Sequence, residues 1–161
     1  MFYFAYGSNL WLKQMEERCP GHRDRGHGVL KGYRWIITAR GYANVVSSGP
    51  DEVHGRVYEL TESDVRSLDR HEGVDSGCYR KELLTVEVAD SKLPCLVYVD
   101  PVEEEGVPRE EYVERINRGI FDSALPPEYV ARYVRRFVPA AGGSRSTRSC
   151  NEPARKAGAE V

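Results

Sequence analysis

The first ten residues constrain the fold more than any other stretch of this chain. Residues 1–6 are apolar and rich in aromatic side chains, and the run is too short for a globular helix, which predicts a buried β-strand. Gly7, Ser8 and Asn9 then break the run, so the chain must turn there. Apolar residues within residues 10–19 predict a short amphipathic helix that Ser8 or Asn9 would cap. Backbone N–H groups at a helix start have no intrahelical partners, so this turn is a candidate anion-binding site.

Hydrophobic patterns predict further strands and helices along the chain. Strands are expected over residues 29–38, 43–46, 53–60, 79–88 and 93–99, with a loop at residues 20–28 and a hairpin turn at residues 47–51. Gly32 lies inside the first of these runs and indicates a β-bulge or a close approach of another backbone. Thr61, with Asp64 three residues later, is a helix-capping signature. Helices are expected from this cap to about residue 71, and over residues 108–121 and 126–137, so the chain should be an α+β protein.

Length and composition restrict the classes of partner. The chain has 161 residues and a net charge of −2, with charges of both signs interspersed, which predicts one domain with no general attraction to nucleic acid or to anionic membranes. A small-molecule or protein partner is therefore expected. The N-terminus has no signal-peptide pattern and no run approaches the length of a membrane span. The cysteines are far apart, which argues against a zinc site or a disulfide framework and fits a reducing cytoplasm: Cys19, Cys78, Cys95 and Cys150.

Apolar periodicity stops near residue 140. Gly, Ser, Arg and Ala dominate from there to the C-terminus. The sequence therefore predicts a folded domain over residues 1–140 and a disordered tail over residues 141–161.

Glu72 is the second candidate for chemistry. Gly73 is suited to end the preceding helix in a left-handed conformation, which puts Glu72 in the last turn, against the negative end of the helix dipole. That position, with partial desolvation, would raise the proton affinity of the carboxylate, as a general base near neutral pH requires. The alternative is an exposed helix-end acid paired with Arg70 or Lys81. The neighbouring His71 is interpreted as a surface or packed histidine.

Three segments in order carry a resemblance to a known family. They are Tyr-Gly-Ser-Asn-Leu at residues 6–10, Gly-Pro-Asp-Glu-Val-His-Gly-Arg-Val-Tyr-Glu-Leu at residues 49–60, and Leu-Asp-Arg-His-Glu-Gly-Val-Asp-Ser-Gly-Cys-Tyr-Arg at residues 68–80. With this order and spacing, residues 1 to about 140 resemble the γ-glutamylcyclotransferase-like family, and residues 68–79 are most similar to its γ-glutamylcyclotransferase branch. The basic tail and residues 22–28 lie outside the likeness.

The resemblance implies a fold and a site. The fold would be a small mixed β-barrel with surrounding helices, with no metal or organic cofactor. Glu72 would be the general base, and Tyr6 and Tyr79 would line the pocket. The backbone of the turn would hold the substrate through Gly7, Ser8, Asn9 and Leu10.

The implied reaction releases an amine from a γ-glutamyl compound as the substrate's own α-amine closes a five-membered lactam, 5-oxoproline. Glu72 would take the ammonium proton and later pass it to the departing amine. The N–H groups of Ser8, Asn9 and Leu10 would grip either the α-carboxylate or the oxyanion. Two alternatives stay open: a leaving group that is not an amino acid, such as an alkylamine, a lysine side chain or an aminoglycoside amine, and a binding module without catalysis. The sequence does not define the leaving group or the oligomeric state.

Overall fold

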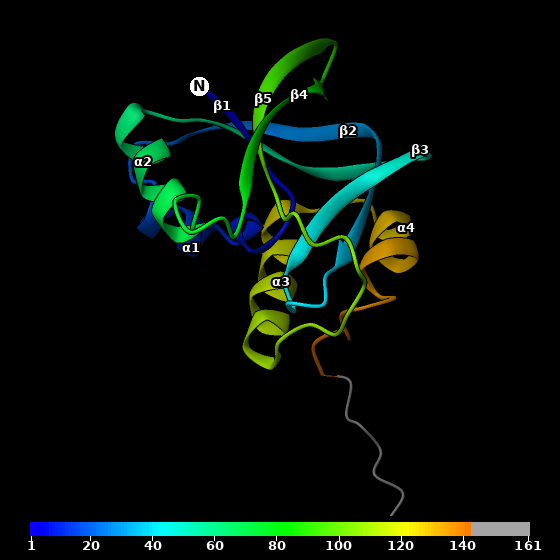
Figure 1. Ribbon diagram of the computed structural model, residues 1–161. Helices are drawn as coiled ribbons and strands as arrows, with labels where there is room; N and C mark the ends of the chain where they lie inside the picture. The colour runs from blue at the N-terminus through cyan, green and yellow to red at the C-terminus, as the bar shows by residue number, and fades with distance from the viewer. Residues whose placement is uncertain (143–161) are drawn as a thin grey trace, which may run out of the picture.

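Five strands close into a small barrel, with the helices packed around it (Figure 1). This computed structural model describes residues 1–142. The strands are β1 (Phe2–Ala5), β2 (Arg23–Ile37), β3 (Ala43–Glu59), β4 (Arg80–Val88) and β5 (Ser91–Val99). Their order is β1-β3-β2-β4-β5, and β5 closes the barrel by pairing in parallel with β1, whereas the other pairs are antiparallel. The expected α+β fold with a mixed barrel is therefore confirmed.

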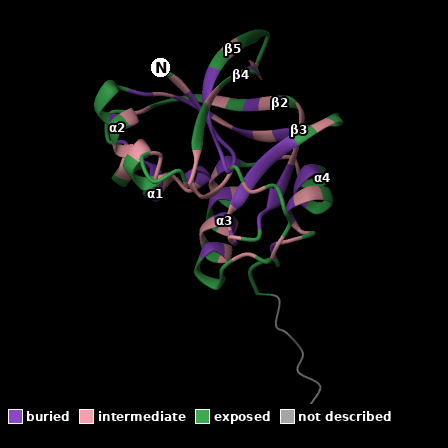
Figure 2. Ribbon diagram, in the orientation of Figure 1, coloured by how far each residue is buried: buried purple, intermediate pink, exposed green. Residues whose placement is uncertain are grey.

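The predicted N-terminal strand is β1, and it lies in the core of the barrel. Its neighbours are β3 on one side and β5 on the other, so both edges are hydrogen-bonded. Phe4 and Ala5 are fully buried, and Figure 2 shows the buried residues gathered along the strands. A strand buried in this way accounts for the apolar run at the start of the sequence.

The helices follow the predicted pattern closely. They are η1, a 3₁₀ turn (Ser8–Leu10), α1 (Leu12–Arg18), α2 (Glu62–His71), α3 (Glu110–Ser123), α4 (Pro127–Tyr129) and the π-helical η2 (Val130–Val134). The capping signature is confirmed, because Asp64 N–H donates to Thr61 Oγ1 (3.1 Å) and Thr61 N–H donates to Asp64 Oδ2 (3.1 Å). The expected last helix is present as α4 and the wider turn of η2 that continues it.

The loop predicted at residues 20–28 is wrong, because β2 already begins at Arg23. Most of the first residues of β2 are exposed, so they carry no apolar pattern, yet their backbone pairs with β3 from Arg23 opposite Glu59 onward. Gly26 and Gly32 have φ angles of 95° and 82° and lie at the two irregularities of this pairing. The bulge expected at Gly32 is confirmed.

The hairpin predicted within residues 43–60 is also wrong. β3 continues through this whole region, and the hairpin instead joins β2 to β3. Lys31 pairs with Glu52 and Tyr33 pairs with Ser47. Residues 48–51 of β3 therefore have no partners in β2 and bulge out opposite the single residue Gly32. A Gly-Pro turn signal here marks an irregularity inside a long strand, because pairing resumes on both sides of it.

Helix α3 supports the η1 turn by direct packing. A Cβ added to Gly119 would lie 2.8 Å from Leu10 Cβ, so only glycine permits this approach of the two backbones. Ser123 Oγ donates to the Leu10 carbonyl at 3.1 Å. These contacts fix the η1 turn, which follows β1, against α3.

The start of α1 differs from the prediction. Its N-cap is Trp11, which makes no side-chain cap, so the expected capping by Ser8 or Asn9 is wrong. Instead, Leu12 N–H donates to Asp122 Oδ2 of α3 at 2.9 Å. Because a tertiary contact satisfies the helix start, the Ser8 and Asn9 side chains are released for other contacts.

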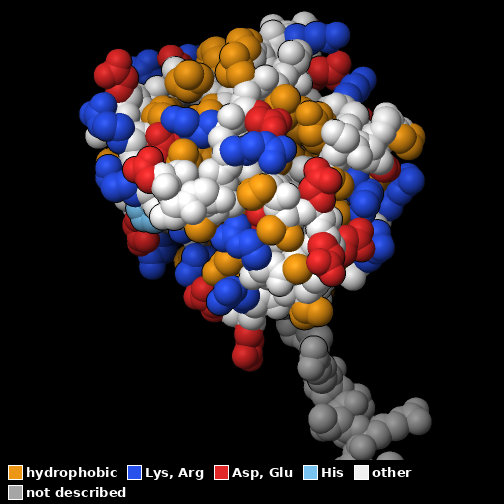
Figure 3. Space-filling model, in the orientation of Figure 1, with side chains coloured by type: hydrophobic (Ala, Val, Ile, Leu, Met, Phe, Trp, Pro, Cys, Tyr) orange, Lys and Arg blue, Asp and Glu red, His pale blue; other side chains and the backbone are white. Residues whose placement is uncertain are grey.

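The surface carries charges of both signs, which are interspersed on the face seen in Figure 3. Within the described part of the chain, no helix combines the length and apolar character needed to cross a membrane. The predicted disordered tail falls outside the described residues apart from residues 141 and 142, and the division of the chain at residue 140 stays a prediction.

Candidate active site

A cavity of about 250 Å³ opens between the η1 turn, the C-terminal end of α2 and the start of β3. It brings together side chains from segments that are far apart in the sequence. Six of the seven site residues expected from the sequence line it, namely Tyr6, Gly7, Ser8, Asn9, Glu72 and Tyr79. The seventh, Leu10, is buried in the core and does not line the cavity.

The backbone amides of the turn differ in whether they are already hydrogen-bonded within the protein. Leu10 N–H donates to the Gly7 carbonyl at 3.1 Å, so it is not available to a ligand. Among residues 1–142, the amide of Asn9 has no hydrogen-bond acceptor, whereas the Ser8 amide interacts with the Tyr112 hydroxyl, and both residues line the cavity. A Cβ at Gly7 would lie 2.9 Å from the Tyr112 hydroxyl, so a side chain there would crowd the cavity wall. The turn thus presents one free amide, that of Asn9, beside a glycine that cannot be enlarged without movement.

Asn9 is held in one orientation by a polar network. Its Oδ1 accepts from Gln14 Nε2 (2.8 Å) and from Arg18 Nη1 (3.1 Å). Because arginine can only donate, this contact identifies the oxygen of the amide. Asn9 Nδ2 therefore points the other way, toward the Tyr3 hydroxyl (2.9 Å) and Glu72 Oε1 (3.4 Å). The side chain links the turn to the carboxylate.

Glu72 faces the cavity from the C-cap of α2. Gly73 follows with φ 62°, so the left-handed helix end expected from the sequence is confirmed. Neither surface pairing considered for Glu72 occurs: it makes no ion pair within residues 1–142, and Lys81 instead pairs with Asp69 at 2.9 Å.

Burial raises the pKa of Glu72 to about 7, while the nearby Arg18 and Arg40 oppose the rise. The side chain keeps partial solvent exposure because the cavity is open, yet protein atoms surround it on its other sides. A carboxyl group with this pKa can both accept and release a proton near neutral pH. The cause is desolvation by the surrounding fold.

The two expected tyrosines form walls of the cavity. Tyr6 donates its hydroxyl hydrogen to the Tyr98 carbonyl at 2.5 Å, and Tyr79 donates its own to the Ala43 carbonyl at 3.1 Å. Burial raises the pKa of both hydroxyls well above the ordinary range, so they stay neutral. Since their hydrogens are engaged, these hydroxyls can only accept from a ligand.

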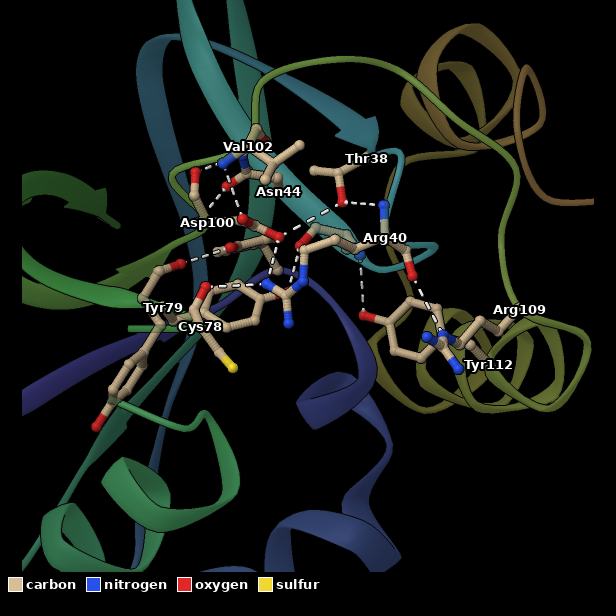
Figure 4. Close-up of polar contacts among 12 residues, drawn as sticks. Thr38, Arg40, Asn44, Cys78, Tyr79, Asp100, Val102, Arg109 and Tyr112 are labelled. Carbon is tan, nitrogen blue, oxygen red and sulfur yellow. Dashed lines mark hydrogen bonds and ion pairs between the residues drawn. The ribbon is translucent and has the colours of Figure 1, made fainter. Parts of the chain in front are cut away.

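Sequence reasoning missed Arg40, which lies in the turn between β2 and β3 and lines the cavity. Figure 4 shows its guanidinium between Asp100 and the Cys78 carbonyl. Asp100 directly follows β5 and is fully buried. No local pattern could have joined these residues, because 60 positions separate Arg40 from Asp100.

The cavity offers acid–base groups and hydrogen-bond donors. His71 is exposed, with Nδ1 2.9 Å from the Ser67 carbonyl, and lies at the cavity edge.

Among residues 1–142, no group of three or more His, Cys, Asp or Glu side chains is arranged to hold a metal ion.

Comparisons with known proteins give the same family. The model of the AIG2-like family matches residues 52–133. The chain is 33% identical over 141 residues to a mouse γ-glutamylcyclotransferase, covering 79% of this chain and 73% of that protein. It is 31% identical over 138 residues to the human γ-glutamylcyclotransferase, with the same shares covered. A solved structure of a γ-glutamyl cyclotransferase superposes with a TM-score of 0.78 at 26% identity, covering 90% of this chain and 92% of that one. The chain therefore belongs to the AIG2-like, γ-glutamylcyclotransferase-like family.

Proposed function

We propose that this protein is a cyclotransferase that converts γ-glutamyl amino acids or peptides to 5-oxoproline and a free amine. The proposal rests above all on Glu72, a carboxyl group in the cavity whose pKa burial raises to about 7. Relatives that share about a third of its residues are named γ-glutamylcyclotransferases, which supports the same reaction class. The free cysteines of the described chain, Cys19, Cys78 and Cys95, fit a reducing cytoplasm as the place of action.

In the proposed mechanism, Glu72 acts as general base and then as general acid. Its carboxylate removes a proton from the substrate's α-ammonium group, and the freed nitrogen lone pair attacks the γ-carbonyl carbon. A new C–N bond closes the five-membered ring, and the carbonyl π electrons move to oxygen. When the oxyanion collapses, the original amide C–N bond breaks and Glu72 passes its proton to the departing nitrogen. The ring nitrogen then gives up its second proton to the freed Glu72 carboxylate, which hands it to the released amine, so the amine leaves as an ammonium group. Atoms and electrons balance without a redox partner or cofactor.

The cavity would hold the substrate in the folded conformation that cyclisation needs. We assign substrate binding to the turn residues Gly7, Ser8 and Asn9, with Tyr6 and Tyr79 as walls. Leu10 is left out of this set because its amide is already bonded to Gly7. The α-amine is then held close to the γ-carbonyl in every bound substrate. In well-oriented reactions such positioning lowers the activation free energy by several kcal/mol.

The test is to incubate the purified protein with a panel of γ-glutamyl amino acids, γ-glutamyl peptides and γ-glutamyl alkylamines, and to measure 5-oxoproline by mass spectrometry. We expect product from the amino acid or peptide members, and a loss of about 10² or more in kcat for Glu72→Gln. Product from the alkylamines alone would replace the proposed leaving group. Binding without product from any member would indicate a non-catalytic module, and full activity of Glu72→Gln would refute the base assignment.

A further inference from the structure

Arg40 carries an unusual arrangement of used and free hydrogen-bond donors. Its Nη1 donates to Asp100 Oδ2 at 2.8 Å and to the Cys78 carbonyl at 2.9 Å, which engages both hydrogens of that nitrogen. Within residues 1–142, Nε and Nη2 make no hydrogen bond. These two nitrogens form one edge of the planar guanidinium, with parallel N–H bonds that match the two oxygens of a carboxylate.

The guanidinium is held rigidly beside the cavity. Asp100 is fully buried, and it also accepts from Val102 N–H at 2.9 Å, so it is itself fixed (Figure 4). The guanidinium carbon lies 5.8 Å from the ring centre of Tyr42 and 5.6 Å from that of Tyr79, and both rings line the cavity. The Arg40 side chain is 32% exposed and lines the cavity. A preorganised donor pair of this kind loses little entropy when it binds an anion.

Arg40 is also tied to the segment that bears Glu72. The Cys78 carbonyl that it holds belongs to a turn in which Cys78 N–H donates to the Gly73 carbonyl at 3.0 Å, and Gly73 directly follows Glu72. Arg40 is close enough to Glu72 to lower the pKa of that carboxyl group. In a γ-glutamyl compound, the α-carboxylate and the α-amine share one carbon atom. A carboxylate bound near Glu72 would bring the amine to the base.

Arg18 is the other cation beside Glu72, but its position differs. It lines both the main cavity and a second cavity next to it, whereas Arg40 lines the main cavity alone. Arg18 also donates to Asn9 Oδ1 and so orients the turn. Arg18 has the larger effect on the pKa of Glu72. It makes no ion pair within residues 1–142, however, whereas Asp100 holds the Arg40 guanidinium in place. Arg40 is therefore the better preorganised ligand for a carboxylate.

We propose that Arg40 binds the α-carboxylate of the γ-glutamyl substrate through its Nε–Nη2 edge, with Asp100 holding the guanidinium in place. This assignment rests on the proposed cyclotransferase function and makes Arg40 a specificity-determining residue. It leaves the free Asn9 amide for the γ-carbonyl oxygen, on which negative charge develops during attack.

The test pairs a change in the enzyme with a change in the substrate. Wild type and Arg40→Lys are assayed with a γ-glutamyl amino acid and with its analogue whose α-carboxylate is a neutral carboxamide. We expect wild type to lose about 10- to 100-fold in kcat/KM on the carboxamide, the range for losing charge-assisted hydrogen bonds. Arg40→Lys should lower kcat/KM by about 10-fold or more on the carboxylate substrate but by less than about 3-fold on the carboxamide. The carboxamide has already lost the contact with Arg40, so the two changes are not additive. Equal losses on both substrates would overturn the assignment.

Arg109 provides a matched control in the same region. Its Nε donates to the Arg40 carbonyl at 3.1 Å and its guanidinium lies 5.0 Å from the Tyr42 ring centre, but it is exposed and does not line the cavity. Arg109→Lys should change kcat/KM by less than about 2-fold on either substrate, as expected for a surface side chain. The same selective loss in Arg109→Lys would assign the effect to the shape of the turn and refute a direct contact by Arg40.

Folding is controlled with a second variant, because loss of Arg40 would strand the buried Asp100 carboxylate. Arg40→Met combined with Asp100→Asn removes both charges and should show the same selective loss of kcat/KM on the carboxylate substrate. Its Tm is measured as well, to show that the double variant is folded. If the selective loss appears in Arg18→Lys and not in the Arg40 variants, Arg18 is the carboxylate ligand. Absence of 5-oxoproline with wild type would overturn the proposed function and this assignment together, whereas active wild type with additive losses would overturn the Arg40 assignment alone.

Discussion

Replacing Glu72 by Gln is expected to stabilise the fold above pH 7 while it removes turnover. Burial raises the pKa of this carboxyl group from an ordinary value of 4.5 to about 7. In the unfolded chain Glu72 ionises above pH 4.5, but in the folded protein it stays protonated until about pH 7. Between these two values the unfolded state binds fewer protons, so the free energy of unfolding of the wild type falls as pH rises.

The size of this effect follows from the two pKa values. One pKa unit corresponds to about 1.4 kcal/mol, so the loss builds up from pH 4.5 to about 7 and reaches about 3 kcal/mol above that range. Gln keeps the shape of the side chain and its hydrogen bond with Asn9 but has no charge to desolvate. The variant should therefore match wild type at pH 4 and exceed it by up to about 3 kcal/mol at pH 8, or by roughly 6–12 °C in Tm for a chain of this length.

Urea unfolding of both proteins at pH 4 and pH 8 measures the effect. Glu114→Gln is the matched control, because Glu114 is an exposed glutamate of α3, with 67% of its side chain accessible, and its loss should change stability by less than about 0.5 kcal/mol at either pH. Equal stabilities of wild type and Glu72→Gln at pH 8 would refute the argument that burial raises the pKa. A variant less stable than wild type at both pH values would mean that the carboxylate is needed to hold the site together.

Four further outcomes are expected. The kcat/KM of wild type should rise as pH passes through about 7, because only ionised Glu72 can accept the ammonium proton, and a profile that is flat from pH 5 to 8 would contradict this. Gly7→Val should raise KM about 10-fold or more, because its Cβ would lie 2.9 Å from the Tyr112 hydroxyl, whereas Gly49→Val, with open space around its Cβ, should leave KM unchanged; equal KM values for the two variants would make the turn a simple connector. A γ-glutamyl substrate with an acetylated α-amine should compete for the cavity without turning over, and accumulation of N-acetylglutamate would instead identify an amidase that activates water. Deleting residues 144–161, which have no apolar periodicity, should leave activity and Tm nearly unchanged, and a large fall in Tm would contradict the predicted domain boundary.

Local physical chemistry explains the parts of the fold that the sequence predicted. The capping box at Thr61 and the left-handed Gly73 depend on a few neighbouring residues, so α2 and its end were legible from the sequence. The alternating residues of β4 turn Leu84 and Val86 inward and Thr85 outward, whereas the apolar end of β5, residues 95–99, is buried on both faces, and both patterns are legible in the sequence. The apolar β1 and the Gly-Ser-Asn break after it located the turn that now lines the cavity.

Tertiary structure decided what depends on distant partners. The exposed start of β2 and the long β3 exist because each supplies the other's hydrogen bonds, so the loop and the hairpin expected from composition were wrong. The sequence pointed to Glu72 through the helix dipole. Its pKa, however, is raised by burial, and burial depends on segments that lie far from Glu72 in the sequence. Arg40 and Asp100 meet only when the barrel closes, since an ion pair across 60 positions leaves no local pattern in the chain. The sequence alone therefore determined most of the elements and pointed to Glu72, whereas closure of the barrel created the cavity in which these residues meet.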